Sequence, residues 1–414
     1  MPTPFTCADP ASLGFDAERL GRISEFLQGS YVGNGRLPMT QLVVARDGQP
    51  VFYDAQGRMG EGRAALREDA IFRIASMTKP VTSVAFMQLV EDCKIALEDP
   101  VSKVIPELGN LSVYAGGGGS IPFAPGAKAA PMRFVDLLTH MSGLTYGLQN
   151  RTNIDAVYRE HNLDFARNSH DSDAYIDILA KMPLEFAPGQ GWNYSVSTDV
   201  LGIAVERLSG MRLGEYFEKH IFAPLGMTDT AFGVAAKDSE RLVDAYQYIP
   251  GKPPRMIDAA EGSRLTQDGL FDSGGGGLCG TVADYHRFTT MLLNGGSLDD
   301  ARILSPKTLR LMRTNHLPGG ADLTDMSSSL FSEANNAGTG FGLGFAMVID
   351  PAKTLMPSSM GEFYWGGAYS TAFFVDPVEA ITMVFMTQVY PSSTYPIRRQ
   401  LKTLIYSALA DSRA

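Results

Sequence analysis

Runs of apolar residues near both ends of the chain predict β-strands. Residues 41–53 place two β-rich runs around Asp47-Gly48, a pair that strongly favours a tight hairpin turn. Three similar runs follow near the C-terminus, at 341–349, 371–375 and 380–388. The strands are therefore expected to come from the two ends of the sequence.

Helical periodicity fills most of the remaining chain. Apolar residues recur at helical spacing in 14–30, and a last helix is expected at about 395–410. The stretch 76–97 is apolar on nearly every side, which is typical of a helix buried in the core. Thr281-Val-Ala-Asp284 resembles a capping box that opens a further helix. Between the strand-rich ends, helical runs such as 199–209 and 213–222 alternate with clusters of glycine and proline.

These patterns predict an α+β fold, with an antiparallel sheet that is flanked by helices and built from the N- and C-terminal segments. We expect residues 1–105 and 271–414 to form the sheet domain and 106–270 to form an inserted, mostly helical domain. The active site is expected at their junction. Residues 318–340, rich in Gly, Ser, Asn and Asp, are expected to form a mobile surface loop.

Charge and composition narrow the classes of partner. The 414 residues carry a net charge of −10, which disfavours nucleic acid and anionic membrane surfaces. No apolar stretch reaches the roughly 18 residues of a membrane span, and no secretory signal is visible. The three cysteines, Cys7, Cys93 and Cys279, match no metal motif and fit a reducing compartment. We therefore expect a cytoplasmic protein.

One short motif carries chemistry. Ser76-Met-Thr-Lys79 is the one Ser-x-x-Lys of the sequence, and it stands at the start of the predicted core helix. Residues three apart lie on one face of a helix, so the lysine amine can approach the serine hydroxyl. Burial disfavours the charged ammonium, and an uncharged amine can accept the proton that a serine nucleophile must lose. Taken alone, a Ser-x-x-Lys is a weak signal, because it arises by chance in many chains.

Several other stretches follow in a fixed order. Together with Ser-x-x-Lys they resemble the serine β-lactamase and penicillin-binding-protein superfamily, and within it the class C-like esterases often called family VIII carboxylesterases. The resemblance extends from about residue 15 to the C-terminus. The supporting stretches are Leu137 to Leu144, Phe186 to Gly189, Asn193 to Ser195, Pro224 to Thr228, Gly275 to Leu278 before Asp284, and Trp365 to Gly367.

The resemblance implies a role for particular residues. Ser76 would be the nucleophile, Lys79 its activating partner, and Tyr194 the tyrosine that exchanges protons with the lysine. The oxyanion hole would consist of the backbone N–H groups of Ser76 and Ala368. Two such donors, aimed at the developing oxyanion, are usually the largest single contribution to catalysis.

Two departures from the β-lactamase pattern favour an ester substrate. Trp365 stands where β-lactamases have a lysine that helps to hold the antibiotic's carboxylate, and Val196 replaces the asparagine of Tyr-x-Asn. Both changes remove polar contacts and leave an apolar surface. The resemblance implies that Trp365, Gly366 and Gly367 contact the substrate, and more weakly that Tyr146 does.

Other chemistries find no support in the motifs. The sequence has no Gly-x-Ser-x-Gly elbow and no His-Glu-x-x-His, and it implies neither a metal nor an organic cofactor. We expect a carboxylesterase that acts on small short-acyl esters. Transfer of the acyl group to another acceptor, hydrolysis of a β-lactam or amide, and a non-catalytic ligand-binding role stay open as alternatives. The sequence does not determine the oligomeric state.

Overall fold

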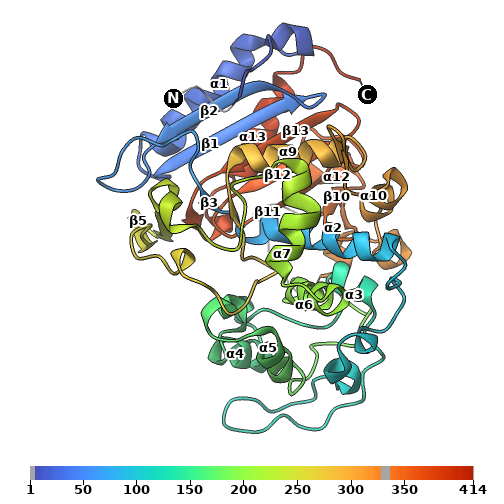
Figure 1. Ribbon diagram of the computed structural model, residues 1–414. Helices are drawn as coiled ribbons and strands as arrows, with labels where there is room; N and C mark the ends of the chain where they lie inside the picture. The colour runs from blue at the N-terminus through green and yellow to red at the C-terminus, as the bar shows by residue number, and fades with distance from the viewer. Residues whose placement is uncertain (1–4, 328–335, 414) are drawn as a thin grey trace.

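A computed structural model describes residues 5–327 and 336–413. Its centre is an antiparallel sheet of seven strands in the order β2-β1-β13-β12-β11-β10-β9. The strands are β1 (Met39–Arg46), β2 (Gln49–Gly57), β9 (Thr339–Phe341), β10 (Ala346–Val348), β11 (Phe363–Gly366), β12 (Ala372–Asp376) and β13 (Ile381–Met386). N-terminal β1 lies between β2 and C-terminal β13, as expected from the sequence (Figure 1).

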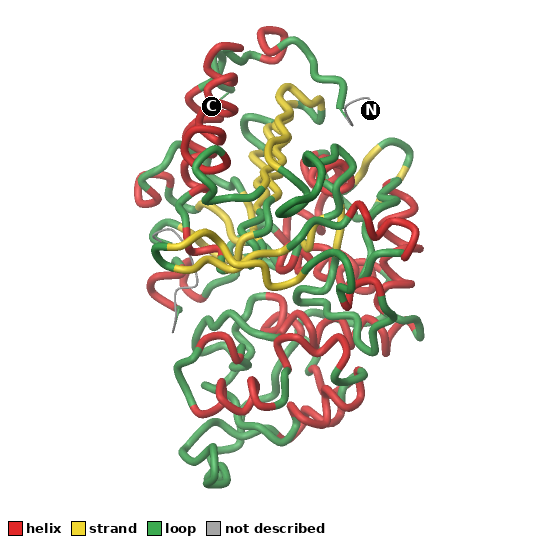
Figure 2. The backbone as a smooth tube through the Cα atoms, turned by 90° about the vertical axis from the view of Figure 1, so that its left-hand side faces the viewer, coloured by secondary structure: helices red, strands yellow, loops and turns green. Residues whose placement is uncertain are grey.

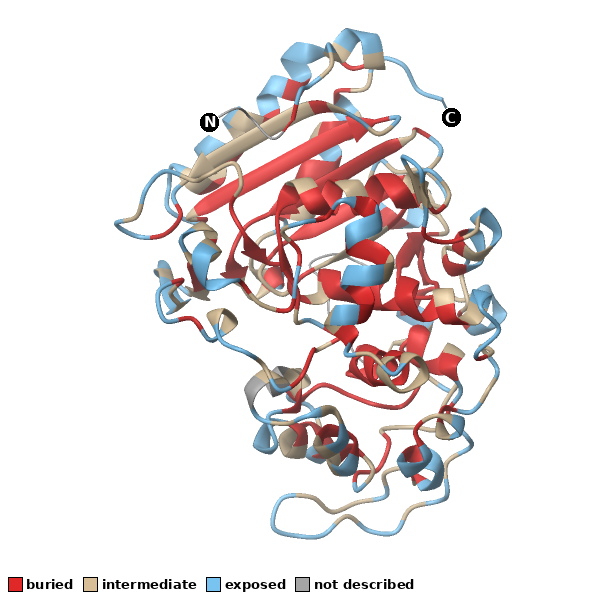
Figure 3. Cartoon of the chain, in the orientation of Figure 1, coloured by how far each residue is buried: buried red, intermediate tan, exposed pale blue. Residues whose placement is uncertain are grey.

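The first hairpin follows directly from its turn residues. Asp47 and Gly48 have φ values of 53° and 75°, which the predicted Asp-Gly turn requires. Every residue of β1 is buried, because the strand has neighbours on both edges and helices over both faces (Figure 3). At its end, the buried Arg46 donates to Glu379 over 2.8 Å and so ties β1 to the turn between β12 and β13.

Helices cover the two faces of the sheet (Figure 2). On one face, α1 (Ala17–Leu27) packs against α13 (Ile397–Ser407). On the other face, α9 (Val282–Leu293) lies across β1, β12 and β13. The Thr281 hydroxyl caps α9 by accepting from the Asp284 N–H, as predicted. The Asp284 carboxylate, however, accepts from residues 229 and 230 and does not complete the reciprocal box.

The predicted core helix is shorter than expected. α2 (Thr78–Glu91) is almost wholly buried, but it ends six residues before Leu97. Cys93, with a φ of 56°, has the left-handed conformation that terminates a helix. Ser76 lies just before α2, in the 3₁₀ turn Ala75–Met77, rather than in the helix itself.

The region between the strand-rich ends is largely helical, and it forms the lower part of Figure 1. Its helix α6 packs against α2. The helices are α3 (Phe134–Leu138), α4 (Asn153–Glu160), α5 (Ser172–Leu179), α6 (Ser197–Ser209), α7 (Leu213–Phe217) and α8 (Ala223–Leu225). The same region also contains β4 (Ala245–Ile249) and β5 (Lys252–Asp258), which form a small sheet with β14 (Val389–Tyr390). The proposed division at residues 105 and 270 stays a prediction.

Short elements complete the fold. They are β3 (Phe72–Arg73) paired with β6 (Cys279–Gly280), β7 (Ser297–Leu298) paired with β8 (Ala301–Arg302), and the helices α10 (Pro306–Met312), α11 (Leu323–Met326) and α12 (Pro351–Thr354). The loop expected at 318–340 lies in part outside the described residues, and its described part contains α11 and β9. No helix among the described residues is long and apolar enough to cross a bilayer.

Candidate active site

Ser76 lies in a turn that other residues hold in a strained conformation. Ala75, directly before it, has a φ of 46°, a left-handed value that is uncommon for a residue with a Cβ atom. The Thr78 hydroxyl donates to the Ala75 carbonyl over 2.7 Å and accepts from the Leu278 N–H over 3.1 Å. Strain of this kind persists where the surroundings fix the backbone, and it concentrates at functional sites.

Tyr194 provides the direct contact with Ser76. Its hydroxyl donates to the Ser76 Oγ over 2.6 Å, across 118 residues of sequence. The Tyr194 ring is 5% exposed and packs against Trp365, with ring centroids 5.5 Å apart, and against Tyr146 at 5.2 Å. The loop before α6 therefore brings a phenol within proton-transfer distance of the serine.

Lys79 is buried behind these two residues rather than bonded to the serine. Its Nζ donates to the Tyr146 hydroxyl over 2.9 Å and to the Gly275 carbonyl over 2.5 Å. It also lies 4.6 Å from the ring centroid of Tyr194, which is a cation–π distance. Among the described residues, Tyr194 and not Lys79 is the hydrogen-bond partner of Ser76. Lys79 thus faces Tyr194, and its positive charge acts on the phenol.

Asp199, which the sequence did not single out, lies next to this lysine network. It is 3% exposed and accepts from the Ser273 hydroxyl over 2.5 Å, from the Gly275 N–H over 3.0 Å and from the Tyr146 hydroxyl over 3.4 Å. Burial raises the pKa of its carboxyl group, and the Lys79 charge opposes that rise. Asp199 lies only five residues after Tyr194, at the start of α6, and this proximity was the one feature of the sequence that could have suggested a role at the site.

Tyr146 connects Lys79 to Asp199. Burial and the nearby Asp199 carboxylate raise the pKa of the Tyr146 phenol well above 10, so this phenol keeps its proton at neutral pH. A protonated phenol can accept from Lys79 with its oxygen and donate to Asp199 with its hydrogen, as the two contacts require. Tyr146 therefore belongs to the lysine network as well as to the cavity wall.

His140 lies below Tyr194, with ring centroids 5.1 Å apart. Burial and the Lys79 charge lower the pKa of its imidazole well below 6.5, which keeps the ring neutral. Its Nδ1 lies 3.2 Å from the Ser195 hydroxyl. The neutral histidine therefore adds no second cation beside Lys79.

The Trp365-Gly-Gly segment ends β11 beside Ser76. A Cβ atom on Gly367 would lie 2.3 Å from both the Ile74 carbonyl oxygen and the Thr371 hydroxyl, so only glycine fits here. Arg398 donates to the carbonyl groups of Gly367 and Thr371, each over 2.8 Å, and fixes this segment. Within the described chain, no acceptor is bonded to the Ala368 N–H, which borders the cavity.

A cavity of about 590 Å³ joins these residues, and this volume is typical of a small-molecule site. Tyr194, Trp192 and Trp365 give it aromatic walls. Of the residues predicted for the site, Lys79 alone does not line it. Those that do are Ser76, Tyr146, Tyr194, Trp365, Gly366, Gly367 and Ala368. No cluster of His, Cys, Asp or Glu in the described ranges could hold a metal ion.

The chain is similar to known proteins over most of its length. The Beta-lactamase family model matches residues 23–406. The chain is 36% identical to the Mycobacterium tuberculosis protein Rv1367c over 329 residues, which cover 79% of each chain. It is 30% identical to the esterase EstB of Burkholderia gladioli over 419 residues, which cover 96% of this chain and 98% of EstB.

A solved structure shares the fold over almost its whole length. EstCE1, described as a hydrolase with promiscuous acyltransferase activity, superposes with a TM-score of 0.77 at 26% identity and covers 97% of this chain and 99% of its own. The predicted α+β fold is thereby confirmed. Because the family model and the esterase EstB both match nearly the entire sequence, the chain belongs to the Beta-lactamase family.

Proposed function

We propose that this protein is a serine carboxylesterase that hydrolyses small short-acyl esters through an acyl-enzyme on Ser76. The observation that carries the proposal is the 2.6 Å hydrogen bond between the Tyr194 hydroxyl and the Ser76 Oγ, inside a cavity with aromatic walls. The relationship to EstB, a protein named as an esterase, supports the same reaction.

In the proposed acylation, Tyr194 reacts as the phenolate, after its proton has left to solvent, so that the Ser76 hydroxyl becomes the donor of their hydrogen bond. The phenolate takes the hydroxyl proton while the Ser76 oxygen attacks the ester carbonyl carbon. The buried Lys79 charge, 4.6 Å from the Tyr194 ring, stabilises the phenolate before the proton is transferred. The Ser76 and Ala368 N–H groups would receive the oxyanion. Collapse of the tetrahedral intermediate then breaks the bond to the alcohol, which leaves with the proton from Tyr194. Water releases the acid in a second, equivalent cycle.

Apolar contacts support an uncharged substrate over an anionic antibiotic. Trp365 lines the cavity where β-lactamases have a lysine, and its ring packs edge-on against Phe341 with centroids 5.5 Å apart. An aromatic wall favours the hydrocarbon part of an ester, because it offers no ionic partner to a carboxylate. A lower activity on a β-lactam than on a short ester is therefore expected.

The decisive experiment compares the wild type with Ser76→Ala on p-nitrophenyl acetate. We expect turnover to fall to background in the variant, whereas equal rates would exclude Ser76 as the nucleophile. Mass spectrometry after treatment with a fluorophosphonate should show one adduct on Ser76 in the wild type. A protein that only binds ligands would remain unlabelled.

Acyl transfer is the second candidate function, because EstCE1 is described as having promiscuous acyltransferase activity. The same acyl-enzyme would react with an alcohol in place of water. Product analysis with p-nitrophenyl butyrate and increasing concentrations of a primary alcohol separates the two. A butyrate ester that accumulates at the expense of butyric acid would support transfer.

A cytoplasmic location stays part of the proposal. Cys7, Cys93 and Cys279 are all unpaired, which is consistent with a reducing compartment. Fractionation of the native host, with activity followed in each fraction, tests it.

A further inference from the structure

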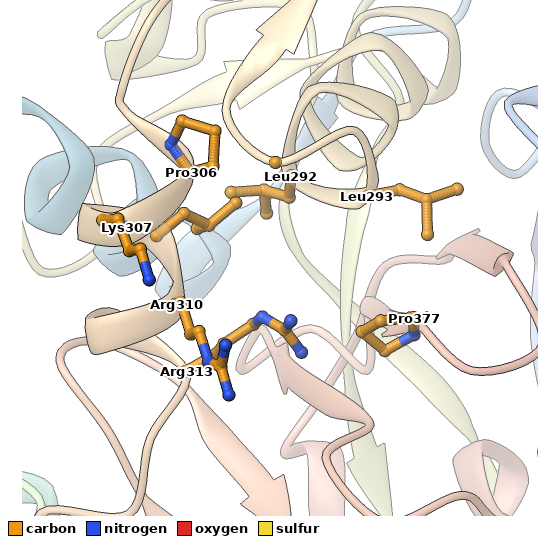
Figure 4. A pocket seen from close by; sticks show the side chains of 9 residues that line it. Leu292, Leu293, Pro306, Lys307, Arg310, Arg313 and Pro377 are labelled. Atoms are coloured by element: carbon orange, nitrogen blue, oxygen red, sulfur yellow. The ribbon is translucent and has the colours of Figure 1, made fainter.

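A second cavity lies apart from the one around Ser76. It has a volume of about 270 Å³ and is formed by the C-terminal end of α9, by α10 and by the turn between β12 and β13 (Figure 4). None of its lining residues also lines the cavity around Ser76. The proposed esterase reaction therefore does not account for it.

Three cations lie along one side of this cavity. Lys307, Arg310 and Arg313 are three residues apart on α10 and its C-terminal cap, so their side chains project from one side of the helix (Figure 4). Across residues 5–327 and 336–413, none of the three side chains forms a salt bridge or a hydrogen bond with another residue. The structure thus places three uncompensated positive charges together in a chain whose net charge is −10.

The carboxylates of the neighbouring β12–β13 turn are engaged elsewhere. Asp376 accepts from the hydroxyl groups of Ser359 and Tyr406, over 2.6 and 2.5 Å. Glu379 is paired with the buried Arg46. Neither is therefore free to neutralise the cations beside Pro377.

The electrostatics of Arg313 are consistent with this lack of compensation. Its guanidinium is half-buried, and both burial and the like charge of Arg310 lower its pKa. Two cations held close together without an anion destabilise each other. A bound anion would remove that repulsion and would form charge-assisted hydrogen bonds with both groups.

The remainder of the cavity is apolar. Leu292 and Leu293 come from α9, Gly295 follows that helix, Pro306 and Leu309 come from α10, and Pro377 comes from the β12–β13 turn. A cavity that combines an apolar surface with guanidinium groups suits a ligand with one charged end and one hydrocarbon end. The volume is close to the lower limit of about 300 Å³ for small-molecule pockets, which restricts the hydrocarbon part to a short chain.

We propose that this cavity binds a small amphiphilic anion, whose carboxylate or phosphate lies between Arg310 and Arg313 and whose short aliphatic chain contacts Leu292, Leu293 and Pro377. Guanidinium groups bind carboxylate and phosphate oxygens in a bidentate manner, and Lys307 adds a third charge at the edge of the site. The inference is independent of the esterase reaction, because the two cavities share no lining residue.

Isothermal titration calorimetry on the full chain tests the proposal with hexanoate, hexyl phosphate, inorganic phosphate and 1-hexanol. We expect hexanoate or hexyl phosphate to bind at least tenfold more tightly than inorganic phosphate or hexanol. The Arg310→Ala/Arg313→Ala variant should lose at least tenfold in that affinity. The stronger of the two hexyl ligands identifies the charged head that the site prefers.

The matched control is Arg22→Ala, which removes an equally cationic but distant side chain on α1 that is paired with Glu18. It should bind as the wild type does. A further variant, Leu293→Asp, adds a carboxylate to the apolar side and should also weaken binding. The double arginine variant and Leu293→Asp should both keep the wild-type turnover of p-nitrophenyl acetate. Equal affinity in the wild type and the double arginine variant would overturn the proposal. So would binding to phosphatidylglycerol vesicles without binding of either hexyl ligand.

Discussion

The Tyr194→Phe substitution tests the proposed catalytic arrangement most directly. It removes the hydroxyl that donates to the Ser76 Oγ over 2.6 Å and leaves the ring that packs against Lys79 and Trp365. General acid–base catalysis contributes roughly 10²- to 10⁴-fold, which corresponds to about 2.7–5.4 kcal/mol of transition-state stabilisation. We therefore expect kcat/KM for p-nitrophenyl acetate to fall by roughly 10²- to 10⁴-fold.

The stability of the fold should change far less than the activity. Loss of one hydrogen bond changes the free energy of unfolding by about 0.5–1.5 kcal/mol. Steady-state kinetics, together with a stopped-flow measurement of the p-nitrophenolate burst, would locate the loss in acylation. Tyr216→Phe is the matched control, because Tyr216 is equally buried but does not line the cavity.

The result that refutes this reasoning is a Tyr194→Phe enzyme whose kcat/KM stays within fivefold of the wild type. In that case the serine proton would have to leave by another route. If kcat/KM fell further in Tyr146→Phe than in Tyr194→Phe, the proton acceptor would have to belong to the Lys79 network instead.

Three further predictions concern stability. Burial lowers the pKa of His286 from 6.5 to about 4. Below pH 6.5 the unfolded chain therefore binds more protons than the folded one, and the fold loses stability as the pH falls towards 4. Between pH 7 and pH 5 the free energy of unfolding should fall by about 2 kcal/mol because of this histidine. Denaturant titrations should show a flatter pH dependence for His286→Gln and an unchanged one for the exposed His161→Gln. Gly21→Ala should raise the unfolding free energy by about 0.8–1 kcal/mol, because a Cβ atom there meets no atom within 4 Å in the exposed part of α1; a lower melting temperature would contradict this. Glu379→Gln leaves the buried Arg46 charge without its partner and should cost about 3–5 kcal/mol, measured by urea unfolding, and an unchanged midpoint would show that the pair contributes nothing.

Local features of the fold could be read from the sequence because short-range sterics determine them. Asp47-Gly48 tolerates the positive φ values of a tight turn, and the β1–β2 hairpin formed where it was expected. The apolar circumference of 78–91 likewise identified a buried helix. Its end was misplaced, because the left-handed Cys93 has no signature comparable to a glycine.

Some features of the candidate site could be predicted from the sequence, and others depend on the tertiary structure. The spacing of Ser76 and Lys79 is a sequence property, and the family resemblance pointed to Tyr194 and Ala368. Only the tertiary structure decided that the tyrosine contacts both the serine and the lysine, that the Gly275 carbonyl accepts from the lysine amine, and that Tyr146 connects this amine to Asp199. Tyr194 lies 118 residues from Ser76 in the chain, and Gly275 lies 196 residues from Lys79. Hydrogen bonds between such segments depend on how the sheet and the helices pack, which no local pattern of residues encodes.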